Sequence, residues 1–114
     1  MLNIRDIQAR TDWSAATDFV CAYHLSLQAE AARDYVLASG QVHSVGELLE
    51  EAFQTVDLDW RGFVHTEQSV DHSPRSCLQG NPQRALQELG WKPQKSFSAL
   101  IREMVEHDLR GPPC

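Results

Sequence analysis

The stretch "SFSALIREMVEHDL", residues 96–109, constrains the fold more than any other part of the chain. Its apolar residues recur at intervals of three and four, which is the spacing of one face of an α-helix. Ser96 is a favoured cap residue at the start, and "GPPC" ends the pattern. An amphipathic helix needs cover for its apolar face, so this helix must pack on something. The face consists of Phe97, Leu100, Ile101, Met104, Val105 and Leu109.

Three further helices are predicted upstream. The first runs over about residues 15–31, with Asp12 or Ser14 as its cap. The second is opened by "SVGE", where Ser44 and Glu47 form a capping box. The third is short, with the cap Asn81 followed by proline at the first helical position, and it ends at Gly90. The apolar faces of the first two helices are Ala15, Ala16, Phe19, Val20, Tyr23 and Leu27, and Val45, Leu48, Leu49, Ala52 and Phe53.

Three extended segments separate these helices. Residues 1–13 alternate apolar and polar positions, "DYVLAS" (34–39) is predicted as a buried strand, and "LDWRGFV" (58–64) is predicted as a strand. Residues 65–80 are polar and irregular. This order predicts a mixed α/β (α+β-like) fold with short strands and three to four helices, formed as a single domain over residues 1–114.

Composition narrows the class of partners. The 114 residues carry 10 basic and 16 acidic side chains, a formal net charge of −6. Because phosphate neutralisation needs clustered Lys and Arg, this balance argues against nucleic acids and acidic membranes as partners. The three cysteines are widely spaced and indicate free thiols in a reducing cytoplasm. Neither an apolar run of about 20 residues nor a signal-peptide pattern occurs, so we expect a cytoplasmic protein.

Several catalytic motifs are missing from the sequence. The six glycines form no dinucleotide-binding GxGxxG pattern, and no GxSxG elbow is present. Tyr23 and Tyr35 are followed four residues later by Leu27 and Ser39, so no Tyr-x-x-x-Lys pair occurs. The sequence therefore predicts no catalytic residue, no cofactor-binding residue and no cofactor for this chain.

We interpret the histidines and tryptophans of this sequence as structural residues rather than as metal ligands or ligand-binding residues. No cysteine pair at zinc spacing accompanies the histidines, so we interpret them as solvated side chains and predict no metal site. Trp13, Trp60 and Trp91 each lie at an element boundary beside apolar neighbours, and we interpret them as packing anchors rather than stacking platforms. The five histidines are His24, His43, His65, His72 and His107.

Four segments in order carry a family resemblance: "RTDWSAATDFVCAYHLSLQ", "RDYVLASGQVHSVGELLEEAF", "LDWRGFV" and "LQGNPQRALQELGWKPQKSFSALIREMVEHDL". Together they resemble the C-terminal part of the GDP-mannose 4,6-dehydratases, members of the extended short-chain dehydrogenase/reductase superfamily. The resemblance extends from about Ile4 to Leu109. "LGWKP" alone is shared by related nucleotide-sugar enzymes, whereas "ASGQVHSV" within the ordered set is more specific.

The resemblance implies a role for this part of the enzyme. In the family, an N-terminal Rossmann domain binds NADP and carries the catalytic Thr/Glu and Tyr/Lys groups, and the smaller C-terminal lobe closes over the GDP-sugar. The present sequence contains none of the N-terminal motifs. We therefore expect a C-terminal lobe without a Rossmann domain, and NADP is implied only for the full-length family.

Departures from the family pattern fall on ligand-facing positions. The family's Gly-Asn-Leu-x-Ala-Lys-Arg-Asp-Trp corresponds to "RDIQARTDW", in which Arg10 replaces lysine and Asp12 and Trp13 are retained. The family's Arg-Pro-x-Glu-Val motif, which reaches the nucleotide, corresponds to "DHSPRS", where Arg75 is the nearby cation. The resemblance thus implies Arg10, Asp12, Trp13 and Arg75 as substrate-binding residues in a partly altered ligand site.

Three functions remain open. The chain is a detached, non-catalytic lobe that binds or once bound GDP-mannose, or a working nucleotide-sugar-binding or regulatory module. The third is a half-enzyme that pairs with a separately encoded Rossmann-domain chain, in which case the pair would be a GDP-mannose 4,6-dehydratase, a lyase. We also expect a homodimer, with the first or last helix at the interface, because a small domain has little core to cover every apolar stripe.

Overall fold

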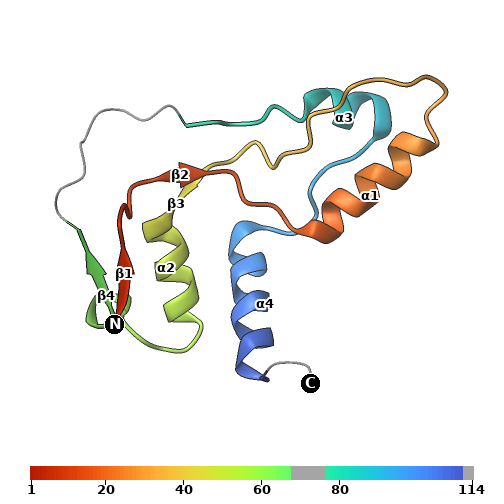
Figure 1. Ribbon diagram of the computed structural model, residues 1–114. Coiled ribbons are helices and arrows are strands. Elements are labelled where there is room, and N and C mark those ends of the chain that lie inside the picture. The colour runs from red at the N-terminus through yellow and green to blue at the C-terminus, as the bar shows by residue number, and fades with distance from the viewer. Residues whose placement is uncertain (68–76, 112–114) are drawn as a thin grey trace. The chain divides into compact units, whose positions relative to one another are not determined.

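A computed structural model describes residues 1–67 and 77–111 (Figure 1). Contacts between Cα atoms divide the chain into two compact units. Unit 1 contains the described parts of residues 1–11, 43–77 and 101–114, and unit 2 contains residues 12–42 and 78–100. The elements confirm the predicted mixed α/β class, with four α-helices and short strands. Within the described residues, no helix combines the length and the apolar character that crossing a membrane requires.

Unit 1 is built on two small two-stranded sheets and one capped helix. Strand β1 (Leu2–Ile4) pairs in parallel with β4 (Val64–Thr66), and β2 (Arg10–Thr11) pairs antiparallel with β3 (His43–Ser44). Helix α2 (Val45–Gln54) follows β3 directly, as Figure 1 shows. The two N-terminal strands confirm the predicted extended start of the chain.

Apolar and aromatic packing holds unit 1 together. Leu49 of α2 and Val64 of β4 are buried. The rings of Phe53 and Phe63 stack with their centroids 5.8 Å apart. The indole Nε1 of Trp60 donates to Glu50 Oε2 at 2.8 Å, which ties the segment after α2 back to that helix.

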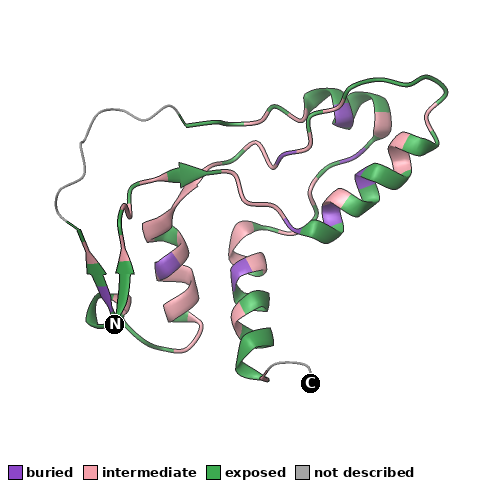
Figure 2. Cartoon of the chain, in the orientation of Figure 1, coloured by how far each residue is buried: buried purple, intermediate pink, exposed green. Residues whose placement is uncertain are grey.

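The core of unit 2 lies between two helices and the segment that follows the second of them. The helices are α1 (Ala16–Leu27) and α3 (Gln83–Leu89), and the core centres on Ala22, Ala85 and Trp91. Figure 2 marks buried positions on both helices and on the segment leading to α4 (Phe97–Leu109). Partly buried side chains complete the core: Phe19, Leu25, Tyr35, Leu37 and Leu89.

The predicted caps are confirmed for α2 and α4, whereas the predicted cap of α3 is wrong, because Pro82 is the cap residue and makes no side-chain cap hydrogen bond. The Ser44–Glu47 capping box forms as predicted. Asn81 Oδ1 accepts from the backbone N–H of Gln83 at 3.0 Å, although the proline between them precedes the first helical residue instead of being it. Gly90 ends α3 in the left-handed region with φ of 66°, and Ser96 Oγ accepts from the N–H of Ala99 at 3.2 Å.

The prediction for the first helix is only partly right. The helix is present, but α1 ends at Leu27, four residues before the predicted end. The predicted cap is wrong, because α1 is capped by Ala15 without a side-chain hydrogen bond. Ser14 donates its hydroxyl to Asp12, and the Asp12 carboxylate binds a different part of the chain.

Two predicted strands are wrong. Residues 34–39, all of them described, form no strand. This segment packs through its side chains, and Gly80 lies so close that an added Cβ would be 2.4 Å from the Cβ of Ala38. In residues 58–64, Asp59 caps a 3₁₀ turn (Trp60–Gly62) by accepting from Arg61 N–H at 3.0 Å. Only the last residue of that predicted strand, Val64, belongs to β4.

Candidate functional site

A carboxylate at the start of unit 2 organises the loop formed by residues 39–41. Asp12 Oδ1 accepts from Ser39 N–H at 3.1 Å and from Ser39 Oγ at 2.7 Å, and Asp12 Oδ2 accepts from Gly40 N–H at 2.9 Å. Ser14 Oγ donates a longer bond of 3.4 Å to Oδ1. Hydrogen bonds to an ionised acceptor are stronger than neutral ones, so this side chain fixes the loop firmly.

The same loop is held from its other side. Gln79 Nε2 donates to the carbonyl of Gly40 at 2.5 Å, and Gln41 N–H donates to Ser39 Oγ at 3.0 Å. Gly40 adopts φ of 78°, a conformation that L side chains rarely adopt. We call Asp12, Ser14, Ser39, Gly40, Gln41 and Gln79 the Asp12 network.

Trp13 lies beside this network in unit 2. Its ring centroid is 5.7 Å from that of Phe97, with the planes inclined by 38°. The indole is partly buried, so it packs on the start of α4 and still presents part of its surface to solvent. This arrangement fits the predicted role of Trp13 as a packing anchor and leaves part of the ring for a ligand.

A second carboxylate, Asp18, fixes the connection between α3 and α4. Its side chain is 7% exposed and its Oδ2 accepts from Gln94 N–H at 3.2 Å and Lys95 N–H at 3.1 Å. The backbone carbonyl of Asp18 accepts from Trp91 Nε1 at 2.8 Å. The prediction of a Trp91 anchor agrees with this burial, whereas sequence reasoning missed Asp18. The sequence feature that could have indicated Asp18 is the presence of an acidic residue among the apolar positions of α1.

Arg10 belongs to unit 1, where it is exposed on β2. It lines an open hollow of about 580 Å³ at the start of α2. The helix N-terminus there is already occupied, because Ser44 N–H donates to Glu47 Oε2 and Glu47 N–H donates to Ser44 Oγ at 3.1 Å. The hydrogen bond from the backbone N–H of Ser44 lowers the pKa of Glu47, and the neighbouring His43 and Arg10 side chains lower it further. An incoming anion at this helix end would therefore compete with Glu47.

This capping box gives a test of local stability. Changing Ser44 to alanine should lower the free energy of unfolding by about 1 kcal/mol. Because the folded-state pKa of Glu47 lies below its unfolded value, its contribution is present above about pH 4.3 and is lost as the pH falls through the folded pKa. Because alanine at position 44 keeps the backbone N–H that chiefly lowers this pKa, the pH dependence is tested with Glu47→Gln. Urea unfolding between pH 3 and pH 7 should show a difference in the free energy of unfolding between wild type and Glu47→Gln that narrows at the acid end. A difference that stays constant across this range would contradict the assignment.

The structure places the four predicted site residues differently. Asp12 and Trp13 lie in unit 2, and Arg10 lies in unit 1. Arg75 lies outside the described residues, so its role stays a prediction. The carboxylate oxygens of Asp12 bind the loop of residues 39–41, which gives this residue a positioning role that the sequence did not indicate. The sequence feature that could have indicated the partners of Asp12 is the glycine-containing stretch "ASGQ", residues 38–41.

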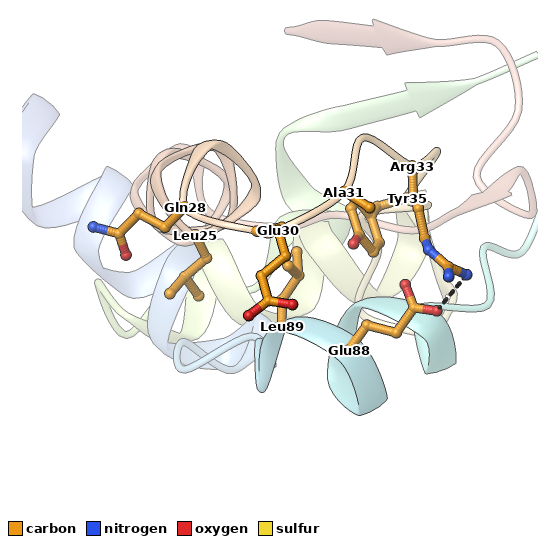
Figure 3. Close-up of a pocket in the computed structure, with 9 residues that line it drawn as sticks. Leu25, Gln28, Glu30, Ala31, Arg33, Tyr35, Glu88 and Leu89 are labelled. Carbon is orange, nitrogen blue, oxygen red and sulfur yellow. Dashed lines mark hydrogen bonds and ion pairs between the residues drawn. The ribbon is translucent and has the colours of Figure 1, made fainter.

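A further hollow in unit 2, of about 540 Å³, lies where the end of α1 approaches α3 (Figure 3). The close-up shows Arg33 and Glu88 joined by an ion pair of 3.2 Å, beside Tyr35. Burial raises the pKa of Tyr35 above its ordinary value, and a hydrogen bond with the Glu88 carboxylate adds to this effect. Sequence reasoning did not predict this hollow, since its lining comes from segments more than 50 residues apart.

Metal-ligating side chains are not gathered in the described part of the chain. Within residues 1–67 and 77–111, no three His, Cys, Asp or Glu side chains lie close enough to hold a metal ion. Of the five histidines, His72 lies outside the described residues.

Solved structures define the class of fold. The chain superimposes on RMD from Pseudomonas aeruginosa complexed with NADPH with a TM-score of 0.77 and 23% identity, covering 92% of this chain and 34% of that one. It also superimposes on dTDP-glucose 4,6-dehydratase from Bacillus anthracis in complex with NAD with a TM-score of 0.81 and 16% identity, covering 96% and 34%. The fold is thus that of about a third of an extended short-chain dehydrogenase/reductase enzyme.

Sequence comparison identifies the family within that class. The family model for GDP-mannose 4,6 dehydratase matches residues 1–104. GDP-mannose 4,6 dehydratase 2 of Arabidopsis thaliana is 39% identical over 109 residues, which are 95% of this chain and 29% of the relative. The human GDP-mannose 4,6 dehydratase is 34% identical over 125 residues, covering 94% and 34%. The chain belongs to the GDP-mannose 4,6 dehydratase family and spans about a third of the length of these relatives, which confirms the resemblance.

Proposed function

We propose that residues 1–114 form a nucleotide-sugar-binding lobe, selective for a GDP-sugar such as GDP-mannose, that has no dehydratase activity by itself. The observation that carries the proposal is the share of each chain that is matched. The match includes 95% of this chain but only 29% of the Arabidopsis relative. The motifs that bind a dinucleotide and that move protons in the family are absent from this sequence. In this proposal NADP serves only a longer or paired enzyme, and these residues hold none of it.

The Asp12 network supports a positioning role in this lobe. Three hydrogen bonds from Ser39 and Gly40 to Asp12 preset the conformation of this loop beside Trp13, so binding would cost little loop ordering. In this proposal Asp12 acts as a positioning residue, and the exposed part of Trp13 packs against the ligand. We also propose the cytoplasm as the location, because the described cysteines, Cys21 and Cys77, are free.

Arginines would supply the charge that a diphosphate needs. In the proposal Arg10 and Arg75 are the main cationic contacts, each worth roughly 1.5–3 kcal/mol when its hydrogen bonds are charge-assisted. The Glu47 carboxylate near Arg10 offsets part of this attraction. Binding should therefore be weaker than in a site with two unopposed arginines.

Titration with GDP-mannose, followed by amide chemical shifts and tryptophan fluorescence, tests this proposal. We expect saturable shifts at Arg10, Trp13 and residues 39–41, and an Arg10→Ala, Arg75→Ala double variant should bind at least about tenfold more weakly. An Arg102→Ala, Arg110→Ala variant removes the same charge from α4 and from the residue that follows it, and it should bind as wild type does. Unchanged affinity in the first variant would refute the assigned contacts, and the absence of any saturable shift would refute binding itself.

A further inference from the structure

The buried side chain of Asp18 binds a segment far from its own helix. Asp18 belongs to the first turn of α1 and is 7% exposed. Ala15, which caps this helix, has no side-chain oxygen, so the Asp18 carboxylate takes no part in a capping box. Its Oδ2 accepts instead from the backbone N–H groups of Gln94 and Lys95, at 3.2 and 3.1 Å. A buried carboxylate is costly unless hydrogen bonds compensate it, so these two bonds identify the segment that the side chain holds.

Asp18 holds this segment at both of its ends. At the later end, the carboxylate accepts from Lys95, two positions before Phe97 begins α4. At the earlier end, Trp91 Nε1 donates to the backbone carbonyl of Asp18 at 2.8 Å. The start of α4 therefore lies where Asp18 places the residues that lead to it.

The start of α4 carries a contact of the tryptophan assigned to the ligand site. The ring centroid of Phe97 lies 5.7 Å from that of Trp13, with the planes inclined by 38°. Aromatic rings at this separation attract each other, and both rings are partly buried. The position of Phe97 therefore limits the orientations that the Trp13 indole can adopt.

These contacts form a closed cycle within unit 2. Trp13 and Asp18 are five positions apart in the chain, and Lys95 and Phe97 are two positions apart. The hydrogen bonds of the carboxylate join the two short segments at one point, and the contact between the two rings joins them at the other. Because both segments are short, a backbone shift at the first junction changes the geometry of the second.

We infer that Asp18 is a positioning residue for Trp13. Its carboxylate holds residues 94–95, and this places the Phe97 ring where it orients the indole. The consequence for a ligand rests on the proposed function, in which the exposed part of Trp13 packs against the GDP-sugar. Asp18 is buried and touches no ligand itself, so its effect on affinity passes through Trp13.

Fluorine NMR of the ligand-free protein tests the positioning. The chain has three tryptophans, so fluorotryptophan labelling gives three resonances, which Trp13→Phe and Trp60→Phe assign. Phe97→Leu removes the ring beside Trp13 and defines the shift that loss of this contact causes. We expect Asp18→Ala to move the Trp13 resonance in the same direction. Asp18→Asn keeps one acceptor oxygen and should move it less.

A matched variant separates positioning from general support of the fold. Leu89→Ala truncates another side chain packed on the core of unit 2 and should leave the Trp13 resonance in place, although it lowers stability. A Trp13 resonance at its wild-type position in both Asp18 variants would overturn the inference, and so would an equal shift in Leu89→Ala. Circular dichroism verifies the fold of each variant, and Asp18→Asn decides alone where Asp18→Ala is unfolded.

Titration with GDP-mannose tests the consequence for the ligand site. We expect Asp18→Ala to weaken binding by about five- to tenfold in the wild-type background, and by less than about twofold in a Trp13→Ala background. Equal losses in the two backgrounds would overturn the role of Trp13 as the link. Absence of saturable binding in wild type would refute the proposed function, and the fluorine resonances would still decide the positioning.

Discussion

Changing Trp91 to alanine should lower the free energy of unfolding by about 3–5 kcal/mol. Trp91 is 3% exposed, lies with Ala22 and Ala85 in the core of unit 2, and has its ring 6.3 Å from that of Phe19. Its removal leaves a cavity between the two helices and also removes the hydrogen bond to the Asp18 carbonyl. Guanidinium unfolding monitored by far-ultraviolet circular dichroism measures the loss, which is comparable with the whole stability of a small domain.

Trp91→Phe is the matched control, because it keeps an aromatic ring and removes the indole N–H. We expect its free energy of unfolding to lie between that of wild type and that of Trp91→Ala. A change below about 1 kcal/mol in Trp91→Ala would show that this side chain does not hold the core of unit 2 together.

Changing Asp12 to alanine should cost about 2–3 kcal/mol and release the loop of residues 39–41. The carboxylate receives three hydrogen bonds from Ser39 and Gly40, at 3.1, 2.7 and 2.9 Å. Without it the two backbone N–H groups lose their acceptors, although water can reach this partly buried site and limits the cost. Amide hydrogen exchange should become faster at Ser39 and Gly40.

Two comparisons make the Asp12 experiment specific. Asp12→Asn keeps one acceptor of similar size and should retain part of the protection at Gly40. Asp59→Ala removes an exposed carboxylate that caps the 3₁₀ turn of unit 1, and it should leave exchange at residues 39–41 unchanged. Wild-type exchange rates at Ser39 and Gly40 in Asp12→Ala would mean that the loop holds its shape without the carboxylate.

The features that the sequence predicted correctly are determined within a few residues. The Ser44–Glu47 box and the Ser96 hydrogen bond each join residues three positions apart. The helices follow from apolar residues that recur every turn, and the aromatic anchor Trp91 follows from its position beside the glycine that ends α3. Local chemistry was sufficient for these features.

The features that were missed depend on residues far apart in the sequence. Asp12 was predicted as a helix cap because it lies just before the first helix. Its hydrogen-bond partners, however, lie 27 and 28 residues later in the chain. Residues 34–39 have the apolar composition of a short buried strand, but the close approach of Gly80 comes from a segment about 40 residues away. A strand also needs a neighbouring strand, and no local pattern specifies one. For the same reason the sequence predicted candidate site residues without their arrangement.

In the proposed function, these residues bind a nucleotide sugar without dehydrating it. Incubating the purified 114-residue protein with GDP-mannose and NADP, and analysing the sugar nucleotides by mass spectrometry, tests the claim most directly. GDP-mannose 4,6 dehydratase 2 from Arabidopsis thaliana in the same buffer provides the positive control. We predict no 4-keto-6-deoxy product above a protein-free blank. Product that grows in proportion to the concentration of this chain would contradict the account.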